Sequence, residues 1–147
     1  MLSLILTIAL FNLIVQQPSA ETPWLDADAL RKAYSGQTHE SFYRYTIEEY
    51  GGVYFEETYF PDGSLTYRGG SLEVAGRWAV KGDQICFEYP ETQLLPGCFV
   101  VAADAGCFYS YEVGRDGSRP AAPHERWWIR ATIKGTDPQC ATDDLVS

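Results

Sequence analysis

The chain has 147 residues, which is enough for one domain with a hydrophobic core of its own. Its 20 acidic and 11 basic side chains give a formal net charge of −9. A surface of that sign repels nucleic acids and anionic lipid headgroups, which proteins bind through clusters of Lys and Arg. We therefore expect no nucleic-acid partner and no attachment to a membrane surface.

The first twenty residues carry no charge, and an apolar run from Leu4 to Val15 is followed by small residues at Ser19 and Ala20. That run is shorter than the roughly 20 residues needed to cross a bilayer. The pattern is typical of a signal peptide, and we expect cleavage after Ala20. Residues 21–147 would then form a single β-barrel-like domain in the periplasm or outside the cell, with no membrane insertion after cleavage.

Residues 24–35 predict one short amphipathic helix. Leu25, Leu30 and Ala33 follow a helical spacing, and Gly36 suits the residue after a helix end because it accepts a positive φ. We expect this helix to cover one end of a β-sheet.

From Glu40 onward the apolar period changes to 2, and aromatic and β-branched residues dominate between short turns such as Pro61 to Ser64 and Lys81 to Asp83. Trp78 is expected to point into the core, beside a Gly76 that makes room for it. The expected strands cover 41–50, 53–60, 65–68, 72–80, 85–89, 98–101, 107–113 and 125–134. About eight short strands predict a mainly β fold, either an antiparallel up-and-down barrel or a compact sandwich, with the barrel favoured because closure removes exposed edges.

Four cysteines, Cys86, Cys98, Cys107 and Cys140, lie in the second half of the chain. An even number in an exported protein indicates two disulfides, for which three pairings are possible. We favour Cys86 with Cys98, because they lie on strands flanking one short connection, which leaves Cys107 for Cys140. The spacing is too wide for a typical zinc site, so no metal site is expected.

No residue pattern indicates catalysis. The two histidines, His39 and His124, stand beside no nucleophile motif and are expected in solvated loops. Paired acids such as Glu56 and Glu57 are expected on solvated strand faces. We therefore predict no catalytic residues and no cofactor, and an uncharacterised hydrolase is the least favoured alternative.

Aromatic residues are abundant, with 4 Trp, 10 Tyr and 7 Phe. Many must fill the core, but a barrel of eight strands is also just wide enough to hold one small ligand. The candidate ligand-binding residues are Tyr54, Trp78, Tyr109 and Trp128. Because Trp127 and Trp128 point to opposite faces, the outward ring could instead form part of a surface for a protein partner. The candidate partner-binding residues are Arg126, Trp127 and Arg130.

Three stretches, LRKAYSGQT, FEETYFPDGSLTY and GRWAVKGDQICFEYP, resemble a family of small secreted bacterial β proteins, domain-of-unknown-function family 995. The likeness covers roughly residues 28–113, and Cys107 and the long loop around Pro120 depart from it. The resemblance implies an exported barrel-like protein and supplies no catalytic residues.

These patterns lead to three functional hypotheses. The first is a non-catalytic, monomeric periplasmic binding module, such as an inhibitor or an envelope-associated factor, with an unknown protein partner. The second is a lipocalin-like carrier of a small apolar or aromatic ligand inside the barrel, and the third is the hydrolase. The missing catalytic motifs and the acidic surface favour the first hypothesis, with the carrier as the alternative.

Overall fold

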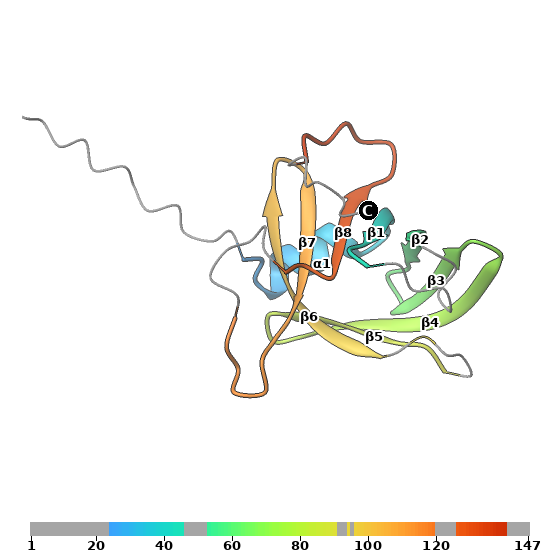
Figure 1. Cartoon of the computed structure of the whole chain (residues 1–147). Helices are drawn as coiled ribbons and strands as arrows, with labels where there is room; N and C mark the ends of the chain where they lie inside the picture. Colours follow the sequence, from blue (N-terminus) through green and yellow to red (C-terminus); the bar gives the residue numbers. More distant parts are fainter. Residues whose placement is uncertain (1–23, 46–52, 91–93, 95, 120–125, 141–147) are drawn as a thin grey trace, which may run out of the picture.

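The structure is a computed structural model that describes residues 24–45, 53–90, 94, 96–119 and 126–140 (Figure 1). The expected signal peptide at residues 1–20 and the expected loop histidine His124 lie outside these ranges and stay predictions. Within the described ranges, no helix has the length and apolar character needed to cross a membrane.

One short helix precedes a closed barrel of eight strands (Figure 1). The elements are α1 (Ala27–Tyr34), β1 (Thr38–Tyr43), β2 (Tyr54–Tyr59), β3 (Ser64–Gly69), β4 (Leu72–Lys81), β5 (Gln84–Glu88), β6 (Gly97–Asp104), β7 (Cys107–Glu112) and β8 (Ile129–Ile133). Each strand pairs antiparallel with the next, and β8 closes the ring by pairing with β1. The fold is therefore the expected up-and-down barrel and not the sandwich.

Alternation along each strand separates the barrel interior from its outer face, as the period of 2 predicted. On β4, Val74, Gly76 and Trp78 are buried while their neighbours are exposed. One detail differs from the expectation. A Cβ on Gly76 would lie 2.8 Å from the ring of Tyr89 and 3.1 Å from Leu65, so this glycine makes room for Tyr89 rather than for Trp78.

The helix covers the end of the barrel where β1 begins and β2 ends. Asp26 caps it by accepting a hydrogen bond from the backbone of Ala29 at 2.8 Å, and Gly36 follows it with a φ of 75°. Leu30 and Tyr34 are buried in the same core cluster as the interior strand residues. We call this end, with α1 across it, the closed end of the barrel.

A second hydrophobic cluster lies on the outer face of β6 and β7 rather than inside the barrel. Its buried members are Val100, Ala102, Cys107, Tyr109, Tyr111 and Trp127. Trp24 packs against it, pairing by a β-bridge with Ala102 and lying 5.4 Å, ring to ring, from Tyr111. The alternate residues of these two strands therefore face two separate cores, one inside the barrel and one outside it.

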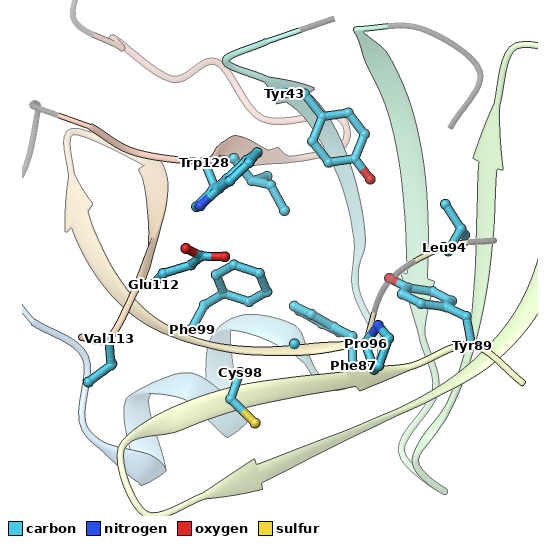
Figure 2. A pocket seen from close by; sticks show the side chains of 12 residues that line it. Tyr43, Phe87, Tyr89, Leu94, Pro96, Cys98, Phe99, Glu112, Val113 and Trp128 are labelled. Atoms are coloured by element: carbon cyan, nitrogen blue, oxygen red, sulfur yellow. The ribbon is translucent and has the colours of Figure 1, made fainter. Parts of the chain in front are cut away.

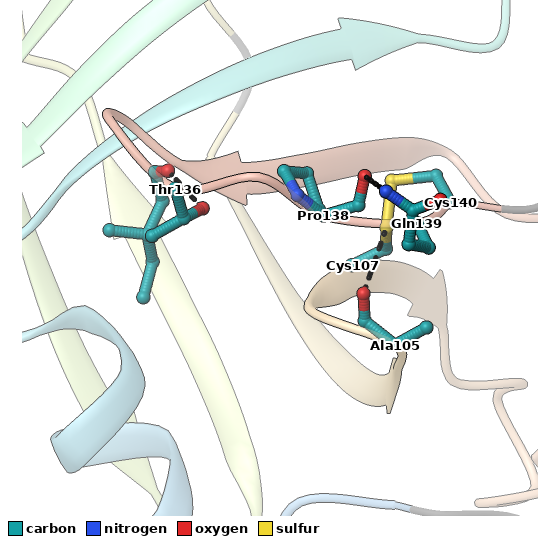
Figure 3. Close-up of a disulfide and its surroundings, with 7 residues drawn as sticks. Ala105, Cys107, Thr136, Pro138, Gln139 and Cys140 are labelled. Atoms are coloured by element: carbon teal, nitrogen blue, oxygen red, sulfur yellow. Dashed lines mark hydrogen bonds between the residues drawn. A yellow bond between two sulfur atoms is a disulfide. The ribbon is translucent and has the colours of Figure 1, made fainter.

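Both disulfides have the favoured pairing. Cys86 and Cys98 are direct partners on β5 and β6, with Cα atoms 4.0 Å apart. Cys107 joins Cys140 and holds the last described segment against the turn between β6 and β7 (Figure 3). There the backbone of Gln139 donates to the carbonyl of Ala105 at 3.0 Å. Two disulfides are typical of a protein in an oxidising compartment, extracellular or periplasmic.

Candidate functional site: the barrel mouth

A cavity of about 350 Å³ lies at the end of the barrel away from α1 (Figure 2). It is lined by the last residues of β1, β5 and β7, the first residues of β6 and β8, and the connection between β5 and β6. The lining residues are Tyr43, Phe87, Tyr89, Leu94, Pro96, Gly97, Cys98, Phe99, Glu112, Val113, Trp128 and Ile129. We call this end the barrel mouth.

The mouth is walled mainly by aromatic rings. Phe87 and Phe99 lie 6.0 Å apart, centroid to centroid, on neighbouring strands, and Tyr43 stacks at 4.3 Å on Phe55 deeper in the barrel. Gly97 allows this arrangement, because a Cβ there would lie 3.0 Å from the ring of Phe99. The volume of the cavity falls in the range typical of small-molecule sites, which are mostly apolar with a few placed polar groups.

Glu112 is the one charged residue among the described residues that line the mouth. Glu112 lies directly opposite Phe99 in the register between β6 and β7, so both side chains face the cavity. Figure 2 shows the carboxylate beside the rings of Trp128 and Phe99. Among the described residues that line the cavity there is no Lys, Arg or His, and no described residue forms an ion pair with Glu112.

A second carboxylate is buried behind the mouth, and its burial corrects the expectation of a solvated Glu57. Glu57 on β2 is 2% exposed. Its two oxygens accept hydrogen bonds from the hydroxyls of Tyr59, at 2.5 Å, and Tyr89. Burial raises the pKa of the Glu57 carboxyl, and the two hydroxyl donors oppose that rise. Because Tyr89 also lines the cavity, it connects the mouth to this buried acid.

His39 lies near the closed end and is also buried, at 0% exposed, where a solvated loop residue was expected. The strand begins at Thr38, three residues before the expected start, so His39 belongs to β1 and faces inward. Its Nε2 donates to the carbonyl of Ala33 on α1 at 3.0 Å, and its Nδ1 has no hydrogen-bond partner among the described residues. Burial lowers the pKa of His39 to about 4, although the Ala33 contact opposes this.

The four aromatic residues predicted to line a pocket do not come together. Trp128 lines the cavity. Trp78 points into the barrel but is fixed by a hydrogen bond from its indole to the carbonyl of Phe60 at 2.9 Å. Tyr54 is 43% exposed on the outer face of β2, and Tyr109 belongs to the outer cluster, because both have the strand parity opposite to the interior residues. These two assignments to the pocket were wrong.

The predicted partner surface is also rearranged. Trp127 is only 1% exposed, because it packs into the outer cluster, with the guanidinium groups of Arg44 and Arg130 at 5.4 and 5.7 Å from its ring. Arg126 is exposed. The Trp127 ring is thus a structural contact and is not available to a partner.

Sequence reasoning missed Phe87, Phe99 and Glu112 as members of a site. Strand alternation places Phe87 and Tyr89 on the inner face. The same alternation, applied to β6 and β7, would also have placed Phe99 and Glu112 there. No sequence pattern indicated that these three residues would border a cavity and not lie in the packed core.

Among the described residues, no group of three or more His, Cys, Asp or Glu side chains is arranged to hold a metal ion. Comparison with known proteins found no matching family model, no matching curated protein and no matching solved structure. The likeness to domain-of-unknown-function family 995 therefore stays a prediction.

Proposed function

We propose that this protein is a non-catalytic binding module of an oxidising compartment and that its barrel mouth holds one small apolar or aromatic ligand. The observation that carries the proposal is the cavity of about 350 Å³ walled by the rings of Tyr43, Phe87, Tyr89, Phe99 and Trp128. Burying a ligand against such rings removes apolar surface from water, which is favourable. The rigid closed barrel keeps the rings in place before binding, which lowers the ordering cost.

Titration with the neutral fluorescent probe N-phenyl-1-naphthylamine tests this proposal. We expect saturable enhancement of probe fluorescence with the disulfide-bonded protein. Trp128→Ala removes part of the wall, and Ile129→Trp places extra volume in the cavity, so both should weaken binding of the probe. Tyr54→Ala, which removes an exposed ring from the outer face, is the matched control and should bind as the wild type does. Absence of saturable binding, or equal binding by all four proteins, would refute the proposal.

Binding of a protein partner, as an inhibitor or an envelope-associated factor, is the second candidate. Its support is a row of side chains on the outer face of β8, β1 and β2. Arg130, Phe42 and Tyr54 are consecutive register partners, with the Arg130 guanidinium 5.6 Å from the Phe42 ring and the Phe42 and Tyr54 rings 5.3 Å apart. Arg and Tyr are enriched among residues that dominate binding energy at interfaces.

A pull-down from an envelope extract tests this second candidate. A specific partner should be retained by the wild type and lost with Tyr54→Ser, while Ile129→Trp at the mouth should retain it. If Tyr54→Ser retains the partner as well as the wild type does, this row of side chains is not the interface.

A further inference from the structure

We infer that the ligand of the barrel mouth is an organic cation: a small molecule with an amine or quaternary ammonium group on an apolar or aromatic body. This inference rests on the proposed binding function and adds the charge class of the ligand. Its basis is the arrangement of the aromatic rings and the Glu112 carboxylate at the mouth.

The rings of the mouth favour a positive charge. The face of an aromatic ring carries negative potential, and ammonium groups bind where several rings surround them. Trp128 directly precedes β8, Tyr43 ends β1 and Phe99 lies on β6, so the three rings surround the cavity from different sides (Figure 2). An uncharged apolar ligand would fit these walls too, so the rings alone do not select a cation.

Glu112 supplies the selection. Its carboxylate faces the cavity from β7, opposite Phe99 in register, with no ion-pair partner among the described residues. A bound ammonium would be attracted to it, whereas a carboxylate or phosphate ligand would be repelled and would find no basic side chain among the described lining residues. The site therefore favours cationic ligands and disfavours anionic ones.

A second acid, Glu57, is buried behind the cavity wall. Both of its oxygens accept phenol hydrogen bonds, from Tyr59 and from the cavity residue Tyr89, which is the arrangement that suits an ionised carboxylate. No described basic side chain contacts it. Burial raises the pKa of Glu57, so the charge selection at the mouth is assigned to Glu112 and not to this buried acid.

The net charge of the whole chain acts in the same direction. At −9, the protein attracts cations and repels anions before contact, and this long-range term weakens as salt is added. The cavity and the overall field therefore favour the same class of small molecule.

Three probes with one phenyl group in common test the inference: 2-phenylethylammonium, neutral 2-phenylethanol and anionic phenylacetate. Each is titrated at pH 7 against the disulfide-bonded protein by displacement of N-phenyl-1-naphthylamine. We expect the ammonium to bind about tenfold more tightly than the alcohol, and phenylacetate to bind more weakly than the alcohol. The preference for the ammonium should decrease in high salt.

Glu112→Gln and Asp28→Asn each remove one negative charge, but only Glu112 lies at the mouth. Asp28 is on the exposed side of α1, with its side chain 97% exposed. Glu112→Gln should reduce the ammonium affinity about threefold and leave that of the alcohol unchanged, and Asp28→Asn should keep the wild-type preference.

The outcomes separate this inference from the binding function. Failure of the neutral naphthylamine probe to bind would refute the binding function itself. If that probe binds but the alcohol or phenylacetate competes as well as the ammonium, only the cation inference is overturned. If Glu112→Gln prefers the ammonium over the alcohol by the same factor as the wild type, the role assigned to Glu112 is overturned.

Discussion

The two ends of the barrel are built from similar residues but differ in how their space is filled. At the closed end, α1 places Tyr34 against His39, Tyr59 and Phe108, with ring centroids 4.4, 5.0 and 6.2 Å from its own. At the mouth, the rings of Phe87 and Phe99 and their neighbours surround a cavity of about 350 Å³. Aromatic content alone therefore does not decide whether a barrel end is solid or hollow.

The difference arises from one short helix. Leu30 and Tyr34 lie four residues apart, on the same face of α1, so a helix of eight residues is enough to fill one end. No described helix covers the mouth. The polar groups follow the same division, because His39 contacts the helix backbone at the closed end, whereas Glu112 faces the cavity.

The largest effect is expected from removing the ring that fills the closed end. Tyr34→Ala should lower the free energy of unfolding by about 4 kcal/mol, because a fully packed aromatic side chain leaves a cavity. Trp128→Ala at the mouth should cost about 1 kcal/mol, since that ring already borders open space. Urea denaturation of both variants measures the contrast. Equal losses would show that the two ends are packed alike.

The second effect is a pH dependence that comes from His39. Its pKa falls from 6.5 in the unfolded chain to about 4 in the fold because of burial. The unfolded state therefore binds more protons between these values, and stability should decrease as the pH falls from 6.5 to 4, by about 3 kcal/mol in total. The contribution is fully present above pH 6.5.

His39→Gln removes this titration and keeps an amide that can donate to the Ala33 carbonyl. The difference in unfolding free energy between wild type and variant should change with pH across this window. Glu57 acts with the opposite sign: its raised pKa gives a contribution that is lost as the pH rises through its folded value. A wild-type-minus-variant difference that is constant from pH 7 to pH 4 would contradict the buried, neutral His39.

The third effect concerns Gly76, where the absence of a side chain makes room for the ring of Tyr89. A Cβ at Gly76 would lie 2.7 Å from the carbonyl oxygen of Glu88 and 2.8 Å from the ring of Tyr89. Backbone cannot move aside as a flexible side chain does, so Gly76→Ala should cost about 2 kcal/mol. Thermal or urea unfolding measures this, and a neutral substitution would show that Tyr89 is loosely held.

Much of the fold could be predicted from the sequence because its signals are local. Alternation on β4, the turn at Gly63 with φ 85°, and the Gly36 helix end with φ 75° each depend on a few neighbouring residues. The pairing of Cys86 with Cys98 followed from the hairpin that connects their strands. Where local periodicity and turn chemistry agree, the barrel follows.

The site could not be predicted because its signals are not local. Glu57 and His39 are residue types that usually lie at the surface. In this fold the hydroxyls of Tyr59 and Tyr89 donate hydrogen bonds to the buried Glu57 carboxyl. The Ala33 carbonyl accepts one from the buried His39 ring. Tyr109 has good strand character, but its parity places it under Trp127 and outside the barrel. Which end is hollow depends on where α1 docks, and that is a property of the whole chain.

The smallest effect tests the hollow mouth directly, with Gly97→Ala. A Cβ there would lie 3.0 Å from the outer edge of the Phe99 ring, and that ring borders the cavity, so it can turn away into open space. The loss of stability should stay below about 1 kcal/mol, less than that of Gly76→Ala, while binding of N-phenyl-1-naphthylamine weakens because the displaced ring takes up cavity volume. A variant as unstable as Gly76→Ala would mean that Phe99 has no space to enter, and the mouth would then be as solid as the closed end.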